Sequence, residues 1–172
     1  MASPSSGGEL SIESMNQMNR EVFVHTLGWL FEDSPWVAWM AWESLPFTSR
    51  EELLQTMIII VQKAEEGRKL ALLRAHPDLG TRLQMSECSQ KEQAGVGLNK
   101  LTKDEYAEFV TLNHNYVEKF GFPFIMAVKG QRKETILAAM KDRVGNTYEQ
   151  ECATALNEVY KIAKFRLNDT IQ

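Results

Sequence analysis

The sequence contains little cysteine and no apolar stretch of membrane-spanning length. Cys88 and Cys152 are its two cysteines, and without a Cys-x-x-Cys pair they argue against a disulfide framework or a zinc knuckle. Two free thiols are typical of the reducing cytoplasm, where we expect this chain to work. The longest unbroken aliphatic run, residues 57–61, is far shorter than the roughly 20 residues that span a bilayer. We therefore expect no membrane partner.

An excess of positive charge is also missing. The chain carries 19 Lys and Arg against 23 Asp and Glu, a formal net charge of -4. Proteins that bind nucleic acid usually present a basic footprint, so we expect no nucleic-acid partner. A small anionic substrate is still compatible with this composition, because a local cluster of basic side chains can oppose the net sign.

The common catalytic motifs are absent as well. The sequence has no Walker loop, no His-Glu-x-x-His and no Gly-x-Ser-x-Gly. Gly95-Val96-Gly97 lacks the third glycine of a dinucleotide fingerprint. These absences argue against the corresponding nucleotide, zinc and serine-nucleophile sites.

The rhythm of amphipathic helices fills almost all of the chain. No stretch alternates with a period of two for long, and neither an internal repeat nor an interdomain linker is evident. We predict an all-α fold, with a single compact multi-helix domain over residues 11–172 after a disordered leader over residues 1–10. The predicted boundaries are a start at Pro35, a capping box at Ser49 with a helix end at Gly67, a helix end at Ala75 or His76, a helix from Thr102 to Gly121, a helix over residues 131–143 and a last helix capped by Asn146.

His76 is the first candidate for chemistry. It precedes Pro77, and a residue before proline is pushed out of the helical region, so the imidazole should lie on a loop rim. Catalytic groups concentrate on such loops, and a histidine with a pKa near its usual value of about 6.5 can both take and give a proton. A structural role is equally open for His76, and it is the favoured reading for His25 and His114.

Two further segments have a structural and a functional reading. Ser89-x-x-Glu92 forms a capping box, or else Glu92 and Gln93 face a pocket from the first turn of a short helix, where backbone N–H groups can hold an anion. Residues 120–125, Phe-Gly-Phe-Pro-Phe-Ile, stop a helix and continue as a buried extended segment, whose backbone groups could also line a pocket.

Arg166 is either an ordinary salt-bridged arginine or a planar clamp for a carboxylate or ureido group.

The tryptophans of the early helix suggest a function of another class. Trp36, Trp39 and Trp42 recur at spacings of three, which places them on one helical face. We favour a core role for this face. The alternative is a non-enzymatic helical interaction module, in which the three rings form a groove for a partner helix and an exposed apolar patch would mark the surface.

Taken in order, the short motifs of the chain resemble the 2-oxo-4-hydroxy-4-carboxy-5-ureidoimidazoline (OHCU) decarboxylase family. The resemblance extends from about residue 11 to residue 167, and it is strongest to the bacterial form that is joined to urate oxidase. The motifs that carry it are Ser34-Pro35-Trp36, Pro46-Phe47, His76-Pro77, Leu79-Gly80, Ser89-x-x-Glu92-Gln93-Ala94-Gly95, Asn113-x-x-Tyr116, Phe120-Gly121-Phe122-Pro123-Phe124-Ile125 and Arg166-Leu167.

The resemblance implies an all-α decarboxylase that needs no metal or other cofactor and is usually a homodimer. Such an enzyme converts OHCU to (S)-allantoin and carbon dioxide, the last step of urate degradation, either fused to urate oxidase or acting with it. A family member that acts on a different ureido acid is the alternative. The family's catalytic residues fall on His76 and Glu92. Its substrate-binding residues fall on Pro77, Ser89, Gln93, Phe122, Phe124, Ile125 and Arg166.

Overall fold

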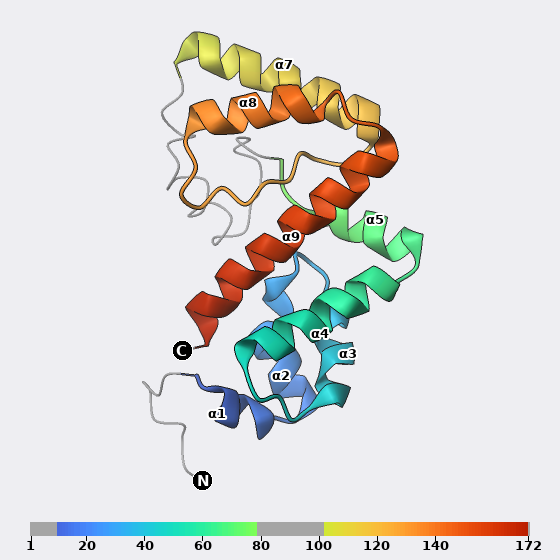
Figure 1. Ribbon diagram of the computed structural model, residues 1–172, viewed down its shortest axis with the longest axis vertical. Helices are drawn as coiled ribbons and strands as arrows, with labels where there is room; N and C mark the ends of the chain where they lie inside the picture. Colours follow the sequence, from blue (N-terminus) through green and yellow to red (C-terminus); the bar gives the residue numbers. More distant parts are fainter. Residues whose placement is uncertain (1–9, 79–101, 172) are drawn as a thin grey trace. The chain divides into compact units, whose positions relative to one another are not determined.

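The computed structural model describes residues 10–78 and 102–171, and every regular element in these stretches is helical. The predicted all-α class is therefore confirmed. In chain order (Figure 1) the elements are α1 Ile12–Asn16, α2 Arg20–Leu27, the 3₁₀ turn η1 Gly28–Leu30, α3 Trp36–Ala41, the 3₁₀ turn η2 Trp42–Ser44, α4 Arg50–Lys63, α5 Glu66–Ala75, α7 Lys103–Phe120, α8 Lys133–Arg143 and α9 Tyr148–Thr170. Within the described stretches, no helix is both long and apolar enough to cross a membrane.

The contacts within the chain divide it into two compact units. The first unit holds the residues up to Lys69 together with those from Ile162 onward, and the second unit holds Leu70 to Lys161. The helices α5 and α9 contribute residues to both units. The single domain over residues 11–172 stays a prediction. The expected leader, apart from Leu10, and Cys88 lie outside the described residues.

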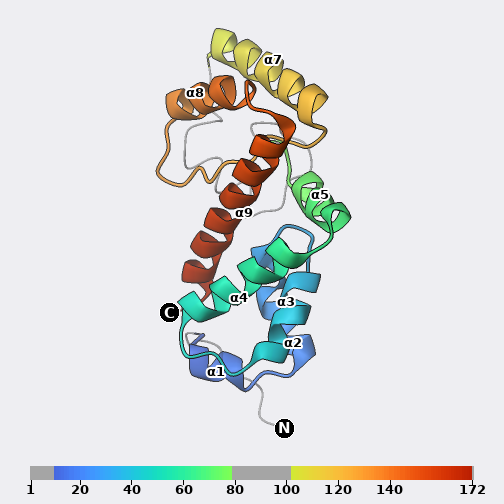
Figure 2. The ribbon, with the colours of Figure 1, turned by 45° about the vertical axis from the view of Figure 1, so that its right-hand side comes forward.

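In the first unit, α3 packs against both α2 and α4 (Figures 1 and 2). Leu53, Met57 and Val61 are spaced by four residues and fully buried, so one stripe of α4 faces the core. Burial of such apolar side chains is the main favourable contribution to folding. The other fully buried side chains of these helices are Phe23, Leu27, Val37 and Ala41.

The ends of α4 differ from the prediction in two details. Ser49 Oγ accepts the Glu52 N–H at 3.1 Å, as predicted, but the Glu52 carboxylate does not return to the Ser49 N–H. It accepts the Thr48 N–H at 2.8 Å and the Thr48 hydroxyl at 2.6 Å. The end at Gly67 is wrong, because Ala64 already leaves the helix with ψ 156° and Gly67 lies in the first turn of α5.

The core prediction for the three tryptophans is wrong for Trp39, which is 48% exposed. The guanidinium of Arg20 lies over two of the rings, 4.2 Å from the Trp39 centroid and 5.0 Å from the Trp42 centroid. Trp42 also donates its indole N–H to the Met18 carbonyl at 3.0 Å. A cationic side chain with an aliphatic stem thus covers part of the apolar surface that we had expected to be core.

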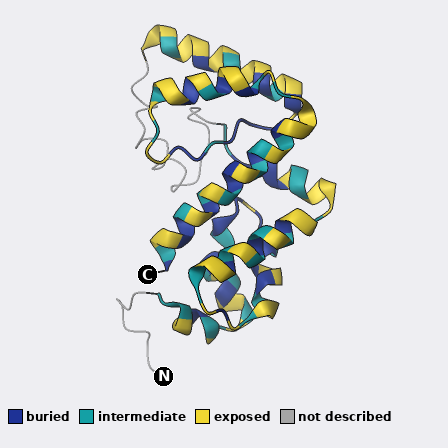
Figure 3. Cartoon of the chain, viewed as in Figure 1, coloured by how far each residue is buried: buried dark blue, intermediate teal, exposed yellow. Residues whose placement is uncertain are grey.

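In the second unit, α7 packs against α8 and carries both of its predicted end signals. The capping box at its start is complete, since Thr102 Oγ1 accepts the Glu105 N–H and Glu105 accepts the Thr102 N–H. At its end Gly121 adopts φ 78°, a left-handed conformation that favours glycine. This glycine turns the chain into residues 122–128, which are mostly dark blue, that is buried, in Figure 3.

The starts of α8 and α9 lie slightly beyond the predicted positions. The helix expected over residues 131–143 begins at Lys133. The predicted cap of the last helix, Asn146, is wrong by one residue, because Thr147 Oγ1 accepts the Gln150 N–H and Gln150 accepts the Thr147 N–H. The Asn146 side chain instead donates to Glu151, 2.9 Å away.

Gly121→Ala should destabilise the protein, because a side chain in the left-handed region costs about 1–2 kcal/mol. Space is not the cause, since a Cβ added at Gly121 would meet Arg74 at an ordinary 3.7 Å. Urea unfolding of the purified variant measures the change. The matched control is Gly67→Ala in α5, where nothing lies within 4 Å of the added Cβ and we expect stability to stay equal or rise by up to about 1 kcal/mol. Equal stabilities for the two variants would contradict the prediction.

Candidate functional site

His76 lies at the end of α5, as predicted, but it is buried. Pro77 has no N–H, so it cannot supply the helical hydrogen bond to the Leu73 carbonyl. The His76 N–H donates to that carbonyl at 3.3 Å, and His76 Nδ1 lies 2.8 Å from the Leu72 carbonyl oxygen. The expected position on a loop rim is wrong, since this contact holds the ring over the helix end and leaves the residue 8% exposed.

The contact with Leu72 also determines the tautomer of the neutral ring. A carbonyl oxygen only accepts hydrogen bonds, so Nδ1 of His76 must carry the hydrogen. In the neutral imidazole Nε2 is then the nitrogen without a hydrogen, and it is the atom that takes up a proton. The contact with the Leu72 carbonyl thus defines which nitrogen of His76 could take up a proton.

The remaining predicted site residues are distributed as follows. Pro77 is partly buried next to His76, while Phe122, Phe124 and Ile125 are at most 3% exposed. Ser89, Glu92 and Gln93 lie outside the described residues. The predicted core role of the phenylalanines is confirmed, because the Tyr116 ring packs against Phe122 and Phe124 with centroids 5.9 and 5.3 Å apart.

Side chains from α5, α8 and α9 hold the backbone of residues 121–127, which we call the strap. Arg74 Nε donates to the Gly121 carbonyl at 3.0 Å, and Arg143 Nη1 donates to the Ile125 carbonyl at 2.7 Å. The N–H of Ala127 donates to Glu158 Oε1 at 3.4 Å. Irregular backbone in a protein interior needs such partners, because its polar groups have no helical ones.

A buried polar cluster, which sequence reasoning missed, lies behind the strap. Glu151 is 0% exposed, and its Oε1 accepts from the Tyr116 hydroxyl at 2.5 Å and from Arg143 Nε at 2.7 Å. Arg143 Nη2 also approaches this oxygen to 2.5 Å, an ion-pair contact whose angle does not make a hydrogen bond. Glu151 Oε2 accepts the Asn146 amide, and the guanidinium carbon of Arg143 lies 4.3 Å from the Phe124 ring centroid.

The missed signal is the position of Glu151 in the helix pattern. The buried residues of α9 recur every four positions, and Glu151 occupies the same stripe as the apolar residues Ala155 and Val159. A carboxylate on a core stripe must be paired, because an isolated buried charge is too costly. The pairing also affects Tyr116, where burial raises the pKa of the phenol well above its usual value of 10 and the Glu151 carboxylate raises it further.

Arg166 belongs to the first unit and is buried there as an ion-paired arginine. Its Nη2 lies 2.9 Å from Glu32 Oε2, and its Nη1 donates to the Trp29 carbonyl at 3.0 Å. Arg166 is 4% exposed and Glu32 is 8% exposed. The structure thus shows Arg166 in a salt bridge, which gives the guanidinium a defined orientation, and the clamp role of Arg166 stays a prediction.

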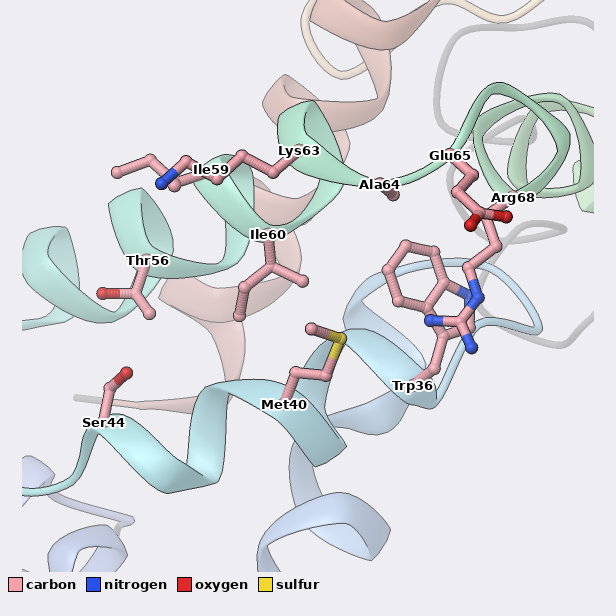
Figure 4. Close-up of a pocket in the computed structure, with 10 residues that line it drawn as sticks. All are labelled: Trp36, Met40, Ser44, Thr56, Ile59, Ile60, Lys63, Ala64, Glu65 and Arg68. Carbon is pink, nitrogen blue, oxygen red and sulfur yellow. The ribbon is translucent and has the colours of Figure 1, made fainter.

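Each unit has a hollow on its surface. The hollow of the second unit, about 240 Å³, is lined by Asp78 and by α7, where Asn113 Oδ1 is buried and has no hydrogen-bond partner among the described residues. The groove of the first unit, about 600 Å³, lies between α3 and α4 (Figure 4), and Arg68 stacks 4.9 Å above the Trp36 ring at one end of it. Of the three tryptophans, Trp36 alone lines this groove.

Within the described residues, no group of three His, Cys, Asp or Glu side chains lies close enough together to hold a metal ion.

A family model described as OHCU decarboxylase matches residues 16–168. The chain belongs to the OHCU decarboxylase family. A relative in Halalkalicoccus jeotgali, named 2-oxo-4-hydroxy-4-carboxy-5-ureidoimidazoline decarboxylase, is 49% identical over 160 residues, which cover 93% of this chain and 91% of that protein. The uric acid degradation bifunctional protein of Bacillus sp. strain TB-90 is 42% identical over 93% of this chain but only 32% of its own length.

Solved structures agree with this family assignment. A crystal structure of (S)-allantoin synthase superposes with a TM-score of 0.80 at 33% identity, covering 94% of this chain and 54% of that one. A crystal structure of OHCU decarboxylase in the presence of (S)-allantoin superposes with a TM-score of 0.68, covering 88% of this chain and 97% of that one. The latter pair is 22% identical and supports the fold alone.

The buried Tyr116 should make the free energy of unfolding of this protein fall at alkaline pH. Because its pKa is raised in the folded protein, it stays protonated there while the unfolded chain ionises above about pH 10. The stabilisation is fully present below that pH and is lost as pH rises. Urea unfolding between about pH 8 and 11 should therefore show a shallower loss for Tyr116→Phe than for the wild type. Tyr106→Phe, which alters a 57% exposed tyrosine of the same helix, is the control and should follow the wild type. Parallel curves for Tyr116→Phe and wild type would contradict this linkage.

Proposed function

We propose that the protein is a carboxy-lyase that converts OHCU to (S)-allantoin and carbon dioxide in urate degradation. The observation that carries the proposal is family membership over residues 16–168, together with 49% identity to a relative that bears the name of this activity. The rival, a non-enzymatic interaction module, requires the three tryptophan rings to form one groove, whereas Trp39 and Trp42 do not line the groove beside Trp36. The alternative is that the substrate is a different ureido acid, which an activity assay with OHCU tests.

The reaction needs a sink for electrons and a controlled proton. When the bond to the carboxylate breaks, carbon dioxide leaves and its electron pair stays with the substrate, where the adjoining carbonyl and ring nitrogen delocalise it. The hydroxyl group loses one proton, while a carbon and the nitrogen that delocalises the charge each gain one, so that the carboxylate form of the substrate takes up one proton overall. An enzyme that has no electron sink of its own must therefore transfer protons and direct hydrogen-bond donors at the charge that develops on the substrate. It must also hold the substrate so that the carbon is protonated from one face.

His76 is suited to the proton transfer through Nε2. Its Nδ1–H is engaged with Leu72, so the neutral ring offers Nε2 as the base that takes the hydroxyl proton, and the resulting imidazolium can return a proton. A positioned acid or base of this kind contributes roughly 100- to 10,000-fold to a rate. Glu92 is expected to orient His76 or a substrate N–H, with Ser89 and Gln93 as further polar contacts. These three residues lie outside the described part of the chain.

The other predicted contacts divide into backbone and side-chain roles. Pro77 would pack against the substrate ring, and the strap residues Phe122, Phe124 and Ile125 would border the pocket through their backbone. Arg166 would clamp a carboxylate or ureido carbonyl with its planar fork. Such oriented donors supply a further factor of about 100 to 1,000.

The proposal extends to the partners of the protein and to its location in the cell. The bifunctional relative of Bacillus sp. strain TB-90 contains a counterpart of this chain within a protein about three times as long, since the match spans 32% of it. This supports a protein that is fused to urate oxidase or acts with it. The homodimer is expected from the family resemblance, and the cytoplasmic location is expected from the low cysteine content of the sequence.

The first experiment is time-resolved circular dichroism in the near ultraviolet. Urate oxidase and 5-hydroxyisourate hydrolase generate OHCU in situ, and the protein is then added. A fast rise of the (S)-allantoin signal is expected. A trace that matches the slow spontaneous decay of OHCU would overturn the proposed activity, and other ureido acids would then be tested by carbon dioxide release.

His76→Asn should lower turnover by at least about 100-fold, because it removes the group that transfers the proton. The substitution tests chemistry more than folding, since the asparagine amide can replace Nδ1 as a donor to the Leu72 carbonyl. Far-ultraviolet circular dichroism should stay as in the wild type. His25→Asn, which alters an exposed histidine of α2, is the control and should keep full activity. Retained turnover in folded His76→Asn would exclude His76 as the acid–base group.

Arg166→Lys should raise KM more than it lowers kcat, because a lysine ammonium cannot reproduce the two-point geometry of a guanidinium. Initial rates over a range of OHCU concentrations measure this split. Arg50→Lys is the matched control, since Arg50 also donates to a backbone carbonyl of the first unit, that of Ile171 at 3.0 Å. If both variants lose thermal stability and neither changes KM, Arg166 has a structural role alone.

A further inference from the structure

The strap between α7 and α8 is held at Ile125 by a polar contact in addition to apolar packing. Phe122 and Phe124 already anchor it through apolar burial, at 1% exposure each. The Ile125 carbonyl, however, accepts a charged donor, Arg143 Nη1, at 2.7 Å. A hydrogen bond to a charged group is stronger and more directional than one between neutral groups, so this contact fixes the orientation of the peptide plane.

Arg143 is itself held from two sides. Its Nε and Nη2 engage Glu151 Oε1, which also accepts the Tyr116 hydroxyl. Its planar face lies 4.3 Å from the Phe124 centroid. The guanidinium therefore connects a carboxylate on α9, a ring of the strap and a carbonyl of the strap, and rotation about its side chain would break one of these contacts.

We infer that Arg143, oriented by Glu151 and Tyr116, is a positioning residue that sets the backbone geometry of residues 122–125 where this segment borders the substrate. The inference rests on the proposed function, because it assigns a purpose to the strap of a decarboxylase pocket. In this role Arg143 does not touch the substrate. It acts through the Ile125 peptide, and the strap in turn determines how the substrate is presented to the proton donor.

A purely structural cluster would behave differently from a positioning one. Loss of a structural contact lowers the melting temperature and the amount of folded enzyme, but the molecules that remain folded keep their KM and their stereoselectivity. Loss of a positioning contact alters both quantities in folded enzyme, because a displacement of about 1 Å at a reacting group can cost up to about 100-fold. The enantiomeric excess of allantoin is the most direct measure, since protonation from one face depends on substrate orientation.

Two substitutions test the inference: Arg143→Lys, which should disturb the cluster strongly, and Tyr116→Phe, which should disturb it less. Lysine keeps the charge but cannot hold the Glu151 carboxylate and the Ile125 carbonyl in one plane, so we expect kcat/KM to fall about 10- to 100-fold with a lower enantiomeric excess. Tyr116→Phe keeps the ring and removes a single hydroxyl contact, so it should fold and show a smaller change in the same direction. Ile136→Val, a cavity-forming change at a fully buried position of α8, is the control and should lower the melting temperature alone.

The measurements are made on folded protein below the lowest melting temperature of the set, with OHCU generated in situ. Hydrogen exchange of the Ile125 and Ala127 amides is measured in parallel and should be faster in Arg143→Lys than in Ile136→Val. Unchanged KM and enantiomeric excess in both Arg143→Lys and Tyr116→Phe would overturn the inference, whatever their melting temperatures. A wild-type protein that does not process OHCU would overturn the proposed function instead, and the exchange data would then decide whether the cluster orders the strap at all.

Discussion

The buried carboxylate of Glu151 is the constraint on which the geometry of the second unit depends. Removing a charge from water costs several kcal/mol, and a core position can tolerate it only when every lone pair finds a partner. Arg143, Tyr116 and Asn146 supply these partners from α8, α7 and the turn before α9. An apolar residue at this position would allow several packing arrangements, whereas a carboxylate with directional partners allows few. The polar cluster therefore specifies how the irregular segment between α7 and α8 is placed.

The same segment is connected to the end of α5. Arg74 donates to the Gly121 carbonyl, and His76 follows Arg74 by two residues on the last turn of that helix. The candidate acid–base group and the start of the strap thus belong to one hydrogen-bonded framework within the second unit. Enzymes gain much of their rate from groups that are already in position before the substrate arrives, and side chains fixed at helix ends meet this need better than side chains on free loops.

The sequence predicted the features of this fold that depend on neighbouring residues. The capping box of Thr102 and Glu105 and the left-handed Gly121 were predicted correctly, because each signal is read within one helical turn. Errors of one or two residues at the helix starts arose where adjacent side chains compete for the same role, as Asn146 and Thr147 do. The cluster around Glu151 could not be predicted, because its partners are up to 35 residues apart and only the fold brings them together. The burial of His76 was missed because a local rule for proline placed the ring outside, while a hydrogen bond to Leu72 turns it inward.

The bond between His76 Nδ1 and the Leu72 carbonyl has a consequence for repeated turnover. The neutral ring donates through Nδ1–H, and the charged ring does so as well, so gaining or losing a proton at Nε2 leaves this anchor intact. A side chain that changed its partners with its charge would have to swing between two rotamers in each catalytic cycle. If His76 is the acid–base group, as proposed, it can therefore gain and lose a proton at Nε2 from one and the same rotamer.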